Sequence, residues 1–167
     1  MNGSITLRPA ADTDEDFLYA VYAATRSDEV AAFGWDPDAQ QAFLRMQFTL
    51  RQRSYKMQFP AAEHSIITVD AAPAGRLIVN RTDKDIRLTD IAMLPAYRAK
   101  GIATFLIRQL QKEAGVAGKP IVLHVDKDNV NARSLYKALG FLVTSESDFM
   151  YEMEWHGSEH DAISLGT

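Results

Sequence analysis

An apolar, β-like run gives way to an apolar helix at Met93-Leu94-Pro95-Ala96-Tyr97-Arg98-Ala99-Lys100-Gly101-Ile102-Ala103-Thr104. Pro95 ends the run, and Arg98 and Lys100 bring positive charge into the turn. Gly101 lets the backbone approach a ligand closely. The first N–H groups of a helix have no partner within the helix, so they attract anions. We therefore predict that residues 98–104, the cradle, hold a pyrophosphate group.

A second stretch supports this interpretation and reads Asn129-Val130-Asn131-Ala132-Arg133-Ser134-Leu135-Tyr136-Lys137-Ala138-Leu139-Gly140-Phe141. It resembles the Asn-x-x-Ala-x-x-Leu-Tyr-x-x-x-Gly-Phe pattern of the GCN5-related N-acetyltransferase (GNAT) family. Arg98-x-x-Gly101-x-Ala103 is similar to the family's Arg/Gln-x-x-Gly-x-Gly/Ala signature, with Ala103 at the second glycine. Both patterns occur once, in the family's order and at a family-like separation. The resemblance extends from about residue 5 to about residue 155.

Length and composition narrow the class of protein. The chain has 167 residues, of which 47% are hydrophobic and 24% charged, as in an ordinary globular domain with room for a sizeable core. It has no cysteine, so disulfides, thiolate metal sites and a cysteine nucleophile are excluded. Its four histidines have no paired spacing, so no metal site is predicted.

Charge and hydropathy set expectations about partners and location. The net charge is −4 and no long basic block is present, which argues against a nucleic-acid surface. No apolar run approaches the ~20 residues of a membrane span. The first residues, Met1-Asn2-Gly3-Ser4, lack a signal-peptide pattern. We therefore expect a cytoplasmic protein with no nucleic-acid or membrane partner.

Hydrophobic periodicity and turn residues predict the order β-α-α-β-β-β-α-β-α-β-β. A strand–helix–strand crossover makes the strands at 86–94 and 121–125 parallel, while the other connections form an antiparallel meander. The resemblance implies a three-layer α+β or α/β arrangement, the acyl-CoA N-acyltransferase fold, with these two strands splayed around coenzyme A. We expect one such domain over residues 1–155, followed by a weakly packed polar tail over 156–167. The other strands are expected at 4–8, 65–69, 75–80, 141–144 and 149–155.

The helices carry further expectations about burial. Asp36 is a good N-cap for a helix that has Pro37 at its first position and ends before Pro60. Residues 27–36, before it, are expected to form a loop. The buried sides of the second and third helices are predicted from helical spacing, and Gly115 is expected to stop the third. These predicted core residues are Phe43, Met46, Leu50, Met57, Ile102, Phe105, Leu106 and Leu110.

The resemblance implies that acetyl-CoA is the acyl donor. In the family, the backbone of the strand before the cradle pairs with pantetheine as an extra strand would, although the side chains there also suit a core. Asn129 matches a family position that touches the pantetheine arm; by residue type, Asn129 and Asn131 also suit a turn and a helix N-cap. The predicted CoA-binding residues are Ile91, Met93, Arg98, Ala99, Lys100, Gly101, Ile102, Ala103, Thr104, Asn129 and Tyr136.

Tyr136 and Asp90 are the candidate catalytic residues. By spacing, Tyr136 shares a helix face with Ala132, Leu135 and Leu139, as a core tyrosine would. The resemblance instead implies a general acid, since a phenol of pKa ~10 keeps its proton at neutral pH and can donate it to a thiolate. Asp90 is the carboxylate nearest in sequence to the pantetheine-pairing residues. Strand alternation turns its side chain away from theirs, so a water chain ending at Asp28, Glu29 or Asp36 is an equal alternative for the base.

The acceptor residues are expected in loop 27–36, where the family usually shapes its acceptor pocket, in the second helix and in the last hairpin. An acidic loop there would attract a cationic amine. The predicted acceptor-binding residues are Glu29, Trp35, Asp36 and Tyr151.

We interpret the sequence as that of an enzyme that transfers an acetyl group from acetyl-CoA to a primary amine. The amine would belong to a small molecule, an amino acid or a peptide N-terminus, and would attack the thioester directly in a ternary complex. Two alternatives stay open: an acyl-CoA-binding or sensing module without significant turnover, and an acyltransferase that uses another acyl-CoA. The sequence decides neither the acceptor nor whether the chain forms a homodimer.

Overall fold

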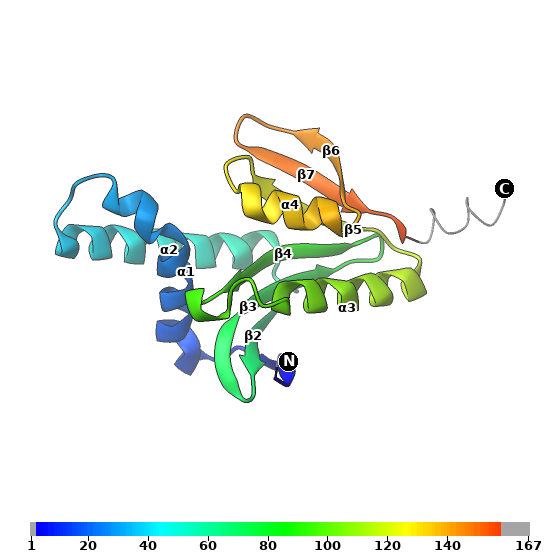
Figure 1. Cartoon of the computed structure of the whole chain (residues 1–167), viewed down its shortest axis with the longest axis horizontal. Helices are drawn as coiled ribbons and strands as arrows, with labels where there is room; N and C mark the ends of the chain where they lie inside the picture. The colour runs from blue at the N-terminus through cyan, green and yellow to red at the C-terminus, as the bar shows by residue number, and fades with distance from the viewer. Residues whose placement is uncertain (1–2, 158–167) are drawn as a thin grey trace. The chain divides into compact units, whose positions relative to one another are not determined.

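A computed structural model describes residues 3–157 of the chain. The expected tail begins inside this range, but its residues 158–167 lie outside it. The elements follow the predicted order, with two 3-10 turns added (Figure 1). The strands are β1 (Ile5–Pro9), β2 (Glu63–Val69), β3 (Ala72–Arg81), β4 (Ile86–Met93), β5 (Ile121–Asp126), β6 (Leu142–Glu146) and β7 (Met150–Trp155). The helices are α1 (Glu15–Ala31), α2 (Pro37–Gln58), α3 (Ile102–Ala117) and α4 (Val130–Ala138), and the 3-10 turns are η1 (Asp12–Asp14) and η2 (Pro95–Tyr97).

The strands form one seven-stranded sheet in the order β1-β2-β3-β4-β5-β7-β6. β4 and β5 are parallel and pair from Ile86 with Ile121 to Leu88 with Leu123. The pairs β1–β2, β5–β7 and β6–β7 are antiparallel. The predicted mixed, mostly antiparallel sheet with a parallel pair at the crossover is therefore confirmed.

The chain divides into two compact units that share strands β3 and β4. Within the described residues, the first unit comprises residues 3–78 and 90–100, and the second comprises residues 79–89 and 101–157. The first half of β4 therefore belongs to the second unit, and the half that leads into the cradle belongs to the first.

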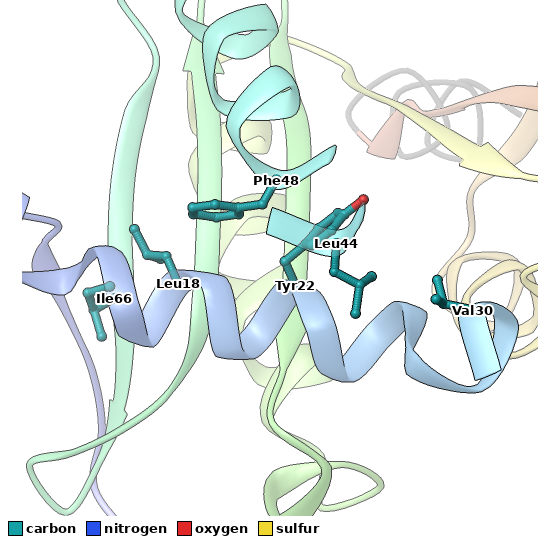
Figure 2. Close-up of a cluster of buried hydrophobic side chains, with 6 residues drawn as sticks. All are labelled: Leu18, Tyr22, Val30, Leu44, Phe48 and Ile66. Carbon is teal, nitrogen blue, oxygen red and sulfur yellow. The ribbon is translucent and has the colours of Figure 1, made fainter. Parts of the chain in front are cut away.

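The core of the first unit lies where α1 packs on α2 and β2 (Figure 2). Leu18, Tyr22 and Val30 lie at four- and eight-residue spacings on one face of α1 and meet the other two elements there. The buried residues that α2 and β2 supply are Leu44, Phe48 and Ile66. Of the residues predicted for the buried face of α2, Phe43 is partly buried and packs against this core. The prediction was wrong for the other three, because α1 covers a neighbouring stripe and leaves Met46, Leu50 and Met57 exposed at 50%, 51% and 83%.

The expected loop over residues 27–36 is shorter than predicted. Val30 is fully buried, so the apolar stripe of α1 continues past residue 27 and the helix runs to Ala31. Asp28 and Glu29 therefore lie in its last turn. Asp36 caps α2 as predicted, its carboxylate accepting the Ala39 N–H at 2.8 Å.

In the second unit, α3 buries most of its predicted residues, but its buried side and its C-terminal end both differ from the prediction. Ile107 and Ala114 join the buried side, whereas Phe105 is 43% exposed. The helix continues past Gly115 to Ala117 and ends at Gly118, which has a left-handed φ of 67°. The predicted end at Gly115 was wrong because Ala114 is fully buried, and its packing stabilises the last turn of the helix.

Candidate functional site

The cradle follows β4 and the turn η2 and contains two residues in the left-handed conformation. Ala99 has φ 59° and Gly101 has φ 79°, both in the left-handed region. Glycine adopts this conformation freely, but an alanine there is destabilised by roughly 1–2 kcal/mol. Strain held at one residue is typical of a loop shaped for a ligand.

The start of α3 presents unpaired backbone donors. Gly101 is the N-cap residue and offers no side-chain cap. The first bond within the helix runs from the Phe105 N–H to the Gly101 carbonyl at 3.0 Å. The N–H groups of Ile102, Ala103 and Thr104 therefore precede the helical hydrogen-bond ladder. Together with the partial positive charge of the helix start, they form a suitable anion site.

The Arg98 side chain folds back onto the end of β4. Its Nε donates to the Met93 carbonyl at 3.1 Å, and its backbone N–H donates to the Pro95 carbonyl at 3.2 Å. Lys100 is exposed. The Met93 side chain is 8% exposed and that of Ile91 is half-buried, so both residues contribute side chains to packing, as their residue types suggest.

Gly75 on β3 has a role that the sequence interpretation missed. A Cβ built on it would lie 2.3 Å from the Ala92 carbonyl oxygen and 2.8 Å from the Met93 sulfur. The Leu94 N–H also donates to the Ala74 carbonyl at 2.8 Å, so the end of β4 is held tightly against β3. A glycine inside a strand pattern is a sequence signal for such a close approach.

Asp90 on β4 forms an ion pair with Arg76 on β3. The Asp90 side chain is 15% exposed and that of Arg76 only 3%. The candidate base therefore has a buried cationic partner, which the sequence did not reveal because the two residues lie on different strands.

Asn129 and Tyr136 are both placed by α4, in the second unit. The Asn129 side chain accepts the Ala132 N–H at 3.2 Å and caps the helix, whereas Asn131 lies within it and does not cap it. Tyr136 is 8% exposed, and its ring centroid lies 5.8 Å from that of Phe141. This burial and ring packing are what helical spacing alone predicts, namely a tyrosine that packs in the core.

Tyr151 lies on β7 and lines a pocket of about 350 Å³ in the second unit. The Lys127 ammonium and the Arg133 guanidinium each lie 5.2 Å from its ring centroid. Such cations attract the face of the ring. Besides Tyr151, the pocket is lined by Arg133, Ser134, Lys137, Phe141, Leu142, Val143 and Met153.

The remaining predicted acceptor residues, Glu29, Trp35 and Asp36, lie in the first unit. Glu29 pairs with the Nε of Arg26 at 2.7 Å, and the Asp36 carboxylate is the cap of α2. The Trp35 ring is 44% exposed and packs against Phe33 and Phe43, with centroid distances of 5.1 Å and 5.3 Å. Both acidic side chains therefore already have partners within the unit.

Comparison with known proteins identifies the family. The model of the acetyltransferase (GNAT) family matches residues 11–141. The chain therefore belongs to the GNAT family of acetyltransferases, as its two motifs predicted. A search of the curated proteins finds no match.

Solved structures share the fold at low sequence identity. The PaiA N-acetyltransferase of Thermoplasma acidophilum, in complex with coenzyme A, is 19% identical with a TM-score of 0.67, over 92% of this chain and 99% of that one. Ard1 of Thermoplasma volcanium is 18% identical with a TM-score of 0.60, over 90% and 95%. The ribosomal-protein-S18-alanine N-acetyltransferase of Escherichia coli is 20% identical with a TM-score of 0.61, over 91% and 93%.

Within residues 3–157, no helix combines the length and the apolar character needed to cross a membrane.

Proposed function

We propose that the protein transfers the acetyl group of acetyl-CoA to a primary amine, and that it does so in the cytoplasm. The observation that carries this proposal is the uncapped start of α3, where the N–H groups of Ile102, Ala103 and Thr104 follow a strained turn at Ala99. Fixed backbone donors bind a pyrophosphate with little loss of conformational entropy. The family membership supports acetyl transfer as the reaction.

CoA would bind through backbone groups for most of its length. The cradle, Arg98 to Thr104, would hold the pyrophosphate. Arg98 is anchored at the Met93 carbonyl, so its positive charge stays close to the strand end. The backbone of Ile91 and Met93 would pair with the pantetheine arm, and the side-chain amide of Asn129 would contact the same arm while its oxygen caps α4.

The chemistry requires one bond to form and one to break. The neutral amine attacks the thioester carbonyl carbon in a ternary complex, and backbone N–H groups near Met93 stabilise the oxyanion of the tetrahedral intermediate. The C–S bond then breaks, and the thiolate leaves. Tyr136 donates its phenolic proton to that thiolate, and the proton lost by the amine passes to a base. Asp90, or a water chain ending at Asp28, Glu29 or Asp36, would serve as this base.

For the acceptor, we propose that Glu29, Trp35, Asp36 and Tyr151 contribute to binding. Glu29→Gln and Asp36→Asn test the acidic pair. Asparagine is as good an N-cap as aspartate, so Asp36→Asn removes the charge without removing the cap of α2. A higher acceptor KM with unchanged CoA affinity would support a role for the charge. An unchanged acceptor KM in both variants would mean that the two carboxylates serve only the ion pair and the helix cap that they already form.

One observation favours the alternative of an acyl-CoA-binding module without turnover. Asp90 is paired with Arg76, Glu29 with Arg26, and Asp36 caps a helix, so three of the four candidate bases have structural partners. A panel of primary amines with acetyl-CoA, followed by thiol release, separates the two functions. Release of CoA that depends on the amine supports the transferase. Tight CoA binding without release for any amine supports the module.

A further inference from the structure

Three arginines of the first unit contact two tyrosines, Tyr22 on α1 and Tyr55 on α2. The Nη1 of Arg26 donates to the Tyr22 hydroxyl at 2.7 Å. The Nε of Arg51 donates to the Tyr55 hydroxyl at 2.7 Å, and the Arg76 guanidinium lies 6.0 Å from the centroid of the same Tyr55 ring. Arg51 and Arg76 therefore place two positive charges around the same Tyr55 ring.

Among residues 3–157, only one of these three cations has no carboxylate within 4.0 Å. Arg26 is paired with Glu29, and Arg76 with Asp90. No carboxylate of residues 3–157 lies within 4.0 Å of Arg51, which is exposed to solvent. Burial raises the pKa of Tyr55 to about 12, so this phenol stays neutral and supplies no negative charge. Two cations, Arg51 and Arg76, thus face the single anion of Asp90.

The neighbourhood also has an unused hydrogen-bond donor. The Nη1 of Arg76 donates a hydrogen bond to Gln52 at 3.2 Å, and its Nη2 donates to Asp90. Its Nε is buried and has no hydrogen-bond partner among the described residues. A buried donor without a partner is unfavourable. Burial, and then the charges of Arg76 and Lys56, lower the pKa of His64, in keeping with the positive charge of Arg76 nearby. The group is therefore short of negative charge and of hydrogen-bond acceptors.

The position of this group connects it to the proposed reaction. Asp90 directly precedes Ile91–Met93, the segment proposed to pair with pantetheine. We propose that Arg51, Tyr55, Arg76 and Asp90, the arginine cluster, recognise a carboxylate on the acceptor amine and that Arg51 binds it directly. This inference rests on the proposed transferase function and narrows the acceptor to a carboxylate-bearing amine, such as an α-amino acid.

The charge balance favours a carboxylate over a doubly charged group. The cluster has one net positive charge, which matches a single negative charge, whereas a phosphate monoester carries about −1.5 to −2 at neutral pH. The Nε of Arg51 donates to Tyr55, which leaves its two terminal nitrogens for a ligand as a planar fork. That fork fits a carboxylate with two parallel hydrogen bonds.

Matched acceptors test the proposal. The probes are the proteinogenic α-amino acids and their primary α-amides, which keep the amine and remove the carboxylate. For the best acceptor of the panel, we expect the acid to exceed its amide in kcat/KM by about 10- to 100-fold, as for the loss of charge-assisted hydrogen bonds. Arg51→Gln should lower kcat/KM for the acid by the same factor and leave the amide within about twofold.

Arg53→Gln is the matched control, because Arg53 is exposed on the same helix. It should change neither acceptor. Arg51→Lys keeps the charge without the planar fork and should give an intermediate loss for the acid. Thermal unfolding shows whether Arg51→Gln folds. If it does not fold, Arg51→Lys still tests the proposal.

Binding separates this inference from the proposed function. Calorimetry of acid and amide on the CoA-saturated protein measures recognition without turnover. If every amine is inert but the acid binds more tightly through Arg51, the transferase function is wrong and the carboxylate site is right. If acid and amide bind and react equally, or if Arg51→Gln weakens both alike, the carboxylate site is wrong whatever the enzyme transfers.

Discussion

Replacing Gly75 by alanine should disturb the strand that is proposed to hold pantetheine. The new Cβ would lie 2.3 Å from the Ala92 carbonyl oxygen, whereas ordinary contacts begin at 3.4 Å. Because the clashing atom belongs to the backbone, no side-chain movement can relieve the contact, and β4 itself must move by about 1 Å. Overpacking of this kind destabilises by about 1–3 kcal/mol, which lowers the Tm of a chain of this size by about 2–12 °C.

The same displacement predicts a loss of function beyond the loss of stability. A misplacement of about 1 Å in a positioning element lowers turnover by about 100-fold. We therefore expect kcat/KM of Gly75→Ala to fall by about that factor and CoA affinity to fall by about 10-fold, measured by thiol release and calorimetry below the Tm of the variant.

Gly34→Ala is the control for stability. Gly34 has φ 75° with no atom within 4 Å of its Cβ position, so alanine there is strained but meets nothing. It should lower stability by about 1–2 kcal/mol and leave CoA affinity unchanged. If Gly75→Ala binds CoA as tightly as Gly34→Ala and turns over at the rate of the unaltered protein, the end of β4 has no part in holding the donor.

Three further perturbations test other parts of the molecule. Gly101→Glu places a carboxylate at the cradle and should weaken CoA binding at least ~10-fold by calorimetry; unchanged affinity in a folded variant would contradict the cradle. Tyr136→Phe keeps the ring packing and removes the proton donor, so kcat should fall by about 100-fold with CoA affinity within a few-fold; a fall in Tm alone would indicate a core role. Hydrogen bonds from Arg8, and then from the Ala11 N–H, lower the pKa of Asp14 to about 2. The stabilisation by the ionised Asp14 is therefore complete above about pH 4 and is lost as the pH falls towards 2. In Asp14→Asn, the free energy of unfolding in urea should fall less steeply between about pH 4 and about pH 2 than in the unaltered protein; an equally steep fall would count against this ion pair.

Local pattern was sufficient for the order of elements and for the family. Asp36 and Pro37 marked the start of α2, and Gly140, with φ 94°, closes the turn after α4 as its position suggested. Such signals depend on a few neighbouring residues, and the backbone requirements of caps and turns are the same in every fold. The same holds for the cradle, whose glycine and small residues are adjacent in the chain.

Side-chain partners required the tertiary structure. Periodicity showed that α2 is amphipathic, but the choice between the Leu44 and Met46 stripes depends on where α1 packs. The length of α1 depended on the burial of Val30, and that of α3 on the burial of Ala114.

Local sequence patterns were enough to predict the order of the elements, the two motifs and, through them, the acetyltransferase family. Three findings came from the three-dimensional structure: Asp90 pairs with Arg76, Gly75 admits the end of β4, and Arg51 has no carboxylate within 4.0 Å among the described residues. The difference follows from distance along the chain. Turns and helix caps form between near neighbours, whereas ion pairs and burial join residues from different strands and helices, whose relative positions no local pattern contains.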